Sequence, residues 1–130
     1  MKRDAVLTIT SLLALLLLLV HLAHDIMYGF EPGGLQILAA VLTIPVVWLC
    51  GVLLWAGRRS GYVITLLGGI LAAYVPYVHM RGVGIGAFTK SNGAFFFVWT
   101  LLALGVAGVF SAVLSLRGLW NSRQARHARP

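Results

Sequence analysis

The sequence has few charged side chains and almost no acidic ones. Asp, Glu, Lys and Arg together make up 10% of the 130 residues, and only three residues are acidic. About 25% of the residues of an ordinary soluble domain are charged. So little charge excludes a well-hydrated surface, whereas hydrophobic residues reach 60% of the chain. The composition therefore predicts that most of the chain lies in a membrane.

Cysteine is nearly absent as well. Cys50 is the single cysteine, so the chain has no internal disulfide. It lies within an apolar run, where a free thiol behaves as a small hydrophobic side chain. Cysteine usage therefore gives no information about the redox compartment.

Long apolar runs dominate what is present. A transmembrane helix needs about 20 mainly apolar residues, whereas a β-barrel strand has about 10 residues of alternating polarity. Four runs fit helices and show no alternation: residues 5–27, 35–56, 62–79 and 93–116. We therefore predict an all-α membrane protein in which residues 1–117 form a bundle of four transmembrane helices. The first run lacks a small-residue cleavage site, so we expect it to be retained.

Positive charge is distributed unevenly among the segments between these runs. The side with both termini and the second loop carries eight basic residues, and the other side carries two: Lys2, Arg3, Arg58, Arg59, Arg117, Arg123, Arg126 and Arg129 against Arg81 and Lys90. Basic residues in short loops favour the cytoplasmic side. The sequence therefore predicts an N-in/C-in, multi-pass protein of the plasma membrane, most simply a bacterial inner membrane.

Residues 118–130 form the predicted basic cytoplasmic tail. Its arginines are expected to contact anionic lipid headgroups. The formal net charge of +7 does not indicate a nucleic-acid partner, because no recognition module accompanies these arginines. The expected partners are the lipid bilayer, its anionic headgroups, and either a second copy of the chain or a larger membrane complex.

Small residues recur every four positions in the third and fourth runs. Such stripes let the backbones of membrane helices approach each other closely. The stripes are Thr65, Gly69 and Ala73, and Ala103, Ala107, Ser111 and Ser115. We predict that these two helices pack through the stripes, with a contact between two copies of the chain as the alternative.

Ionisable side chains gather at the predicted outer end of the bundle. His21 and Asp25 are four residues apart and share a helix face, with His24 close by. Counting about 1.5 Å per residue from the cytoplasmic side places His79 at a similar depth on the third helix. Glu31 follows on the same side. The candidate ligand or proton-relay residues are therefore His21, His24, Asp25, Glu31 and His79.

Several kinds of site fit this group of residues. Polar side chains near an interface reach water without having any special role. Alternatively, His21, His24 and His79, supported by Asp25, bind Zn or Cu. A haem held between His79 and a histidine of the first helix is a further alternative, as is a proton relay through a His–Asp pair.

The sequence assigns no single activity. No nucleophile with a base at a known spacing is visible, so nothing in the sequence indicates an enzyme. We expect a small multi-pass membrane protein whose outer cluster binds a small ligand, a metal or a partner. The alternatives are a proton- or metal-coupled transporter acting as an oligomer and an accessory subunit of a larger membrane complex.

Overall fold

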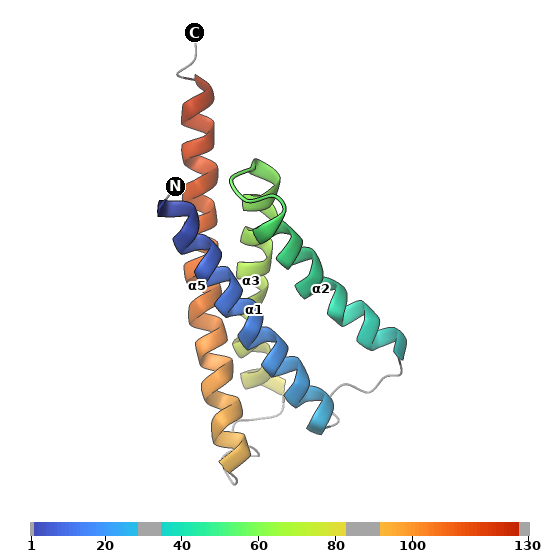
Figure 1. Cartoon of the computed structure of the whole chain (residues 1–130). Helices are drawn as coiled ribbons and strands as arrows, with labels where there is room; N and C mark the ends of the chain where they lie inside the picture. Colours follow the sequence, from blue (N-terminus) through green and yellow to red (C-terminus); the bar gives the residue numbers. More distant parts are fainter. Residues whose placement is uncertain (1, 29–34, 83–91, 128–130) are drawn as a thin grey trace.

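The computed structural model describes residues 2–28, 35–82 and 92–127. These residues form the helices α1 (Lys2–Tyr28), α2 (Leu35–Leu53), α3 (Arg59–Gly82) and α5 (Asn92–His127). Figure 1 shows them side by side as an all-helical bundle, with both chain ends toward one end of it. The predicted all-α class is therefore confirmed for the described residues.

Three helices are long and apolar enough to cross a membrane. The candidate spans are Ala5–Met27, Arg59–Arg81 and Phe95–Gln124, whereas α2 contributes a shorter apolar stretch, Ala39–Leu53. The second helix was expected to reach residue 56, but it ends at Leu53. The chain then turns through Gly57, whose φ of 73° is strained for any residue with a Cβ. The described residues thus support three candidate spans, and the fourth stays a prediction.

α3 and α5 meet backbone to backbone at two glycines. A Cβ added at Gly108 would lie 2.6 Å from the backbone nitrogen of Ala73 and 2.8 Å from the backbone oxygen of Gly69. A Cβ added at Gly69 would lie 2.8 Å from the backbone oxygen of Gly108. Close approach of backbones is a main source of attraction between helices in lipid. These two glycines therefore fix how α3 sits against α5.

The serines of the α5 stripe also take part in packing against α1. The hydroxyls of Ser11 and Ser111 share a hydrogen bond of 2.8 Å, and both side chains are fully buried. Ala107 and Ser115 are buried too, whereas Ala103 is exposed. The stripe therefore contacts α1 as well as α3, and its first member lies outside the packed interface.

An apolar layer separates this serine pair from the histidine cluster. Leu15 and Leu18 of α1 pack with Ala72 of α3 and Leu104 of α5. Leucines on the other side of α1, such as Leu13 and Leu16, remain exposed. In a membrane an exposed leucine contacts lipid, so one face of the leucine-rich helix forms the core and the other meets the bilayer.

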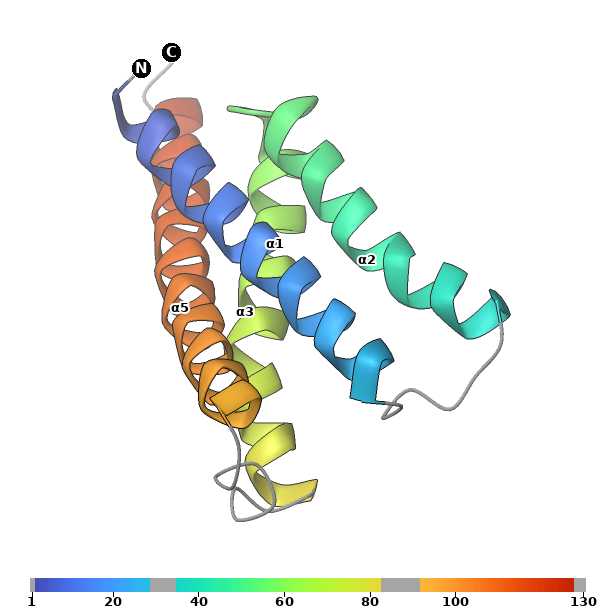
Figure 2. The same cartoon turned by 60° about the horizontal axis from the view of Figure 1, so that its bottom comes forward.

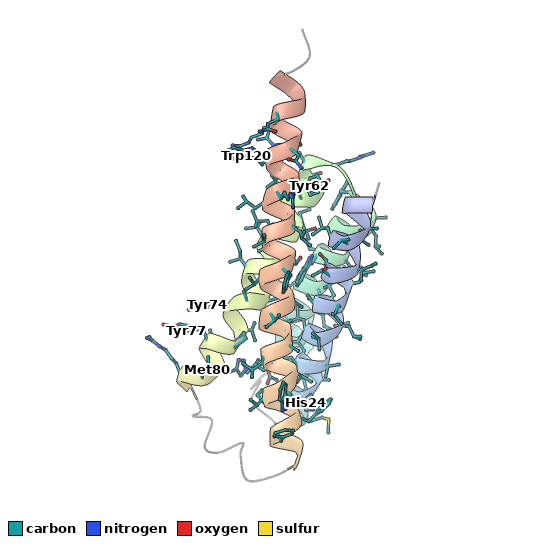
Figure 3. The ribbon with its side chains drawn as sticks, turned by 90° about the vertical axis from the view of Figure 1, so that its left-hand side faces the viewer. His24, Tyr62, Tyr74, Tyr77, Met80 and Trp120 are labelled. Atoms are coloured by element: carbon teal, nitrogen blue, oxygen red, sulfur yellow. The ribbon has the colours of Figure 1, made fainter. Side chains whose placement is uncertain are left out.

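Different large side chains lie toward the two ends of the bundle. Figure 3 shows Tyr62 and Trp120 toward one end, and Tyr77, Met80 and His24 toward the other. Figure 2 shows α1 and α2 inclined in the same direction, with α2 leaning away from α3 toward the end where α1 finishes. α5 is about 54 Å long, which exceeds a hydrocarbon core of about 30 Å. Because α5 continues to His127, most of the predicted basic tail, residues 118–130, is helical.

Candidate metal centre

Three polar side chains from two helices converge at the end of the bundle where α1 and α3 finish. The Nε2 atom of His21 lies 3.2 Å from Oδ2 of Asp25, one turn further along α1. The Nε2 atom of His79, on α3, lies 3.7 Å from the same oxygen. One potential ligand atom from each residue falls within 4.8 Å of the others. The structure thus brings together two imidazoles and one carboxylate.

This His/Asp cluster (His21, Asp25 and His79) is largely hidden from the surface. The side chains of His21 and Asp25 are 3% and 7% exposed, and that of His79 is 26% exposed. The rings of His21 and His79 are edge to face, with centroids 4.5 Å apart. Burying ionisable groups costs free energy unless they are paired or bind a metal. The burial therefore makes simple contact with interfacial water a poor explanation of the cluster.

A backbone hydrogen bond fixes the orientation of the His79 ring. Its Nδ1 donates to the carbonyl oxygen of Val75 at 3.0 Å, one helical turn earlier. With the proton on Nδ1, the neutral ring carries its lone pair on Nε2, the nitrogen that approaches Asp25. Ligating histidines usually donate the other ring N–H in this way. His79 is therefore held in the tautomer that a metal ligand needs.

The second imidazole has an unsatisfied atom. The Nδ1 atom of His21 is buried and has no hydrogen-bond partner among the described residues. An unpaired buried polar atom costs about 1–3 kcal/mol. Such an atom commonly marks the position of a water molecule or ligand. Nε2, the other ring nitrogen, is the one that faces Asp25, so this unpaired atom is not the one that would bind a metal in the cluster.

The third predicted histidine does not join this cluster. His24 donates from Nδ1 to the carbonyl oxygen of Val20 at 2.8 Å. Its ring packs near Phe96 and Phe97, with centroids 5.6 Å and 6.0 Å away. The structure thus groups Asp25, rather than His24, with the other two imidazoles. Glu31, the remaining candidate, lies outside the described residues.

The sequence analysis did not single out Phe97, which borders the cluster. Its side chain is 1% exposed, and its ring centroid lies 5.3 Å from that of His21 and 5.8 Å from that of His79. The sequence feature that could have pointed to Phe97 is the aromatic run at residues 95–97. An aromatic run at the start of a helix is also typical of a membrane interface, so this run did not by itself indicate a site. The Phe97 ring therefore lies beside the imidazoles of His21, His24 and His79.

The cluster has the donor set of a metal site, and two of its ligand separations are close to those of one. In a tetrahedral zinc site with bonds of about 2.0–2.1 Å, neighbouring ligand atoms lie about 3.3 Å apart. The distances from the Asp25 oxygen to the two imidazole nitrogens, 3.2 Å and 3.7 Å, bracket that value. Two imidazoles and one carboxylate also leave a coordination position open, as in catalytic zinc and non-haem iron sites.

The same geometry does not fit a haem between His21 and His79. Axial imidazoles bind from opposite faces of the porphyrin, so the macrocycle separates their rings. Here the two rings contact each other.

Comparison of the chain with known protein families, curated proteins and solved structures found no match. The geometry of the His/Asp cluster is therefore the basis on which a function is assigned.

Proposed function

We propose that this is a membrane protein that binds a divalent transition metal through His21, Asp25 and His79. The observation that carries the proposal is the convergence of three ligand atoms within 4.8 Å from two separate helices. Zn²⁺ suits this mixture of imidazole and carboxylate ligands. With three protein ligands, the fourth position is open to water or to a small ligand. Such a site acts on something it binds rather than only holding the fold together.

Metal binding also accounts for the cost of burying these side chains. A carboxylate away from water needs a positive partner. A divalent cation placed between Asp25 and the two histidines would supply one. Intramembrane ionisable residues are rare and commonly functional, which favours a site over incidental polarity.

The transporter alternative needs more than one copy of the chain. Ser11 and Ser111 lie at one level of the bundle, and the His/Asp cluster lies about 15 Å further along α1. Leu15, Leu18 and other apolar side chains fill the core between them. Between these levels Thr100 is a buried polar residue, but its hydroxyl donates to the Phe97 carbonyl oxygen of its own helix. A relay through a single bundle is therefore poorly supported by the described residues, and a path at an interface between copies is the simpler form of this alternative.

The proposed topology places the metal centre near the outer surface. The N-in/C-in arrangement with α2 as the fourth span is supported by the uneven distribution of Lys and Arg, and a bacterial inner membrane is the location proposed for it. α2 has 19 residues and a length of about 28 Å, close to a hydrocarbon core of about 30 Å. In this arrangement the C-terminal end of α5 projects into the cytoplasm, where its arginines contact anionic headgroups.

Zinc binding by the purified protein tests the proposal. Metal-stripped protein in detergent is titrated with Zn²⁺, and one ion per chain is expected to bind. His79→Ala removes one of the three ligands. Loss of an outer-shell partner alone costs about 10–100-fold in metal affinity, and loss of a ligand should cost at least as much.

His24→Ala is the matched control, because His24 lies one turn from His21 on the same helix but outside the His/Asp cluster. It should bind zinc as tightly as the unmodified protein. Helicity measured by circular dichroism shows whether each variant is folded. Equal zinc affinity in the unmodified protein and a folded His79→Ala variant would contradict the proposal.

A further inference from the structure

A pocket between α3 and α5 adjoins the proposed metal centre. It has a volume of about 180 Å³ and is lined by Pro76, His79, Met80, Phe97, Val98, Leu101 and Leu102. Among the described residues that line the pocket, His79 is the single polar one, and it is also a member of the His/Asp cluster. The pocket therefore connects an apolar space with one of the proposed metal ligands.

The pocket opens on the face of the bundle that meets lipid. Its floor includes the buried side chains of Phe97 and Leu101, whereas Met80 and Leu102 at its rim are 47% and 45% exposed. All of these residues lie in candidate membrane spans. A ligand that enters between these rim residues comes from the bilayer rather than from water, so it must be soluble in the membrane.

The size of the pocket sets how much of a ligand it holds. An apolar protein cavity of about 150 Å³ binds one benzene molecule. The pocket beside His79 is slightly larger, at about 180 Å³. It therefore accommodates a short segment of an alkyl chain and leaves the rest of that chain in the bilayer.

Charge defines the head group of this ligand. A divalent metal bound by Asp25 and two neutral imidazoles carries a net charge of +1. A net charge beside hydrocarbon is costly, and a ligand with one negative charge would neutralise it. A carboxylate meets this need, because its oxygens bind zinc at about 2.0–2.2 Å.

Resting on the metal centre proposed above, we infer that the protein binds a membrane-soluble monocarboxylate, of the fatty-acid class. Its carboxylate takes the open coordination position beside His79. The first carbons of its chain occupy the pocket between α3 and α5. No bond is made or broken in the ligand, so this step is coordination alone.

Cobalt-loaded protein gives a direct readout of this binding. Co²⁺ replaces Zn²⁺ in the same ligand set, and its visible absorption changes when a new ligand enters the coordination shell. The protein is placed in phosphatidylcholine nanodiscs and titrated with decanoate, with methyl decanoate or with acetate. Decanoate should change the cobalt spectrum in a saturable way. The methyl ester, which lacks the charge, should not, and acetate, which lacks the chain, should need a far higher concentration.

Val98→Phe fills the pocket without replacing a proposed metal ligand. Each buried methylene contributes about fourfold to affinity, so excluding two of them should weaken decanoate binding by about tenfold or more. Val106→Phe introduces the same side chain on the same helix, at a position 58% exposed and outside the pocket lining. It should leave the decanoate affinity unchanged.

The outcomes separate this inference from the proposed function. Absence of cobalt binding would overturn both the metal centre and the carboxylate site. Cobalt binding without a decanoate response, with an equal response to acetate, or with equal decanoate affinity in Val98→Phe would overturn the carboxylate site alone. A decanoate response that Val98→Phe weakens and Val106→Phe does not would support it.

Discussion

At the scale of single residues, Asp25 is the centre of the candidate site. Its Oδ2 atom is the one that both imidazoles approach, one from the same helix and one from α3. A carboxylate that only oriented His21 would need a single partner. Its position between the two rings is the one expected if the carboxylate and both histidines bind the same metal ion.

Asp25→Asn is predicted to separate charge from shape. The amide keeps the size of the side chain but loses its negative charge, so zinc affinity should fall by at least about tenfold. The metal-free variant should be as stable as the unmodified protein or more so, because a desolvated charge has been removed. Zinc titration and thermal unfolding in detergent measure the two effects. Unchanged zinc affinity in Asp25→Asn would show that the carboxylate is not a ligand.

At the scale of elements, the pairing of α3 with α5 determines where His79 lies. The two backbones meet at Gly69 and Gly108, three turns from the end that carries the His/Asp cluster. The absence of a side chain at Gly105 also leaves room for the ring of Pro76, since a Cβ there would lie 2.8 Å from the Cγ of that proline. The register of α3 on α5 is thus set by small residues, and the site depends on it.

Gly108→Leu is predicted to force α3 and α5 apart. Overpacking of a tight interface typically costs about 1–3 kcal/mol, and here the added atoms would meet backbone rather than flexible side chains. Thermal unfolding followed by circular dichroism should show lower stability, and zinc affinity should fall with it. Ala103→Leu is the control, because Ala103 is exposed on the same helix. Equal losses in both variants would mean that the glycine contact has no special role.

The sequence predicts the helices and the approximate depth of the site better than it predicts the ligand set. Apolar length placed the first, third and fourth helices, and counting residues placed His21 and His79 at one level. The rotation of α1 was not predictable. Residues on a helix turn by about 100° each, so His24 lies about 60° to one side of His21 and Asp25 about 40° to the other. Only the position of α3 decides which of them faces His79.

The position of Phe97 beside the histidines was not predictable from the sequence either. Its place beside the histidines depends on α5 lying against both α1 and α3, and neighbour order is not encoded in any local pattern of a four-helix sequence. The lean of α2 was unpredictable for the same reason, because an apolar helix gives little indication of which face packs.

At the scale of the whole molecule, the two ends of the bundle carry different ionisable side chains. Arg117 and Arg123 lie in the last part of the candidate span Phe95–Gln124, and the His/Asp cluster lies at the opposite end of the bundle. The proposed orientation therefore exposes the metal centre to the outer side of the membrane.

Cysteine accessibility is predicted to report this orientation. In a Cys50→Ala background, Ser60→Cys and Gln124→Cys should react with a membrane-impermeant thiol reagent only after the cells are opened. Met27→Cys, at a side chain 81% exposed near the other end, should react in intact cells. Labelling of Met27→Cys and Gln124→Cys from the same side would refute the proposed topology.

The most direct test of the metal centre is X-ray absorption spectroscopy of the zinc-loaded protein. We predict a shell of two imidazole nitrogens and one carboxylate oxygen at about 2.0–2.1 Å, completed by water or a small ligand. His79→Ala should lose one imidazole from that shell, and His24→Ala should lose none. A shell without imidazole, or one that His79→Ala leaves unchanged, would contradict the central claim.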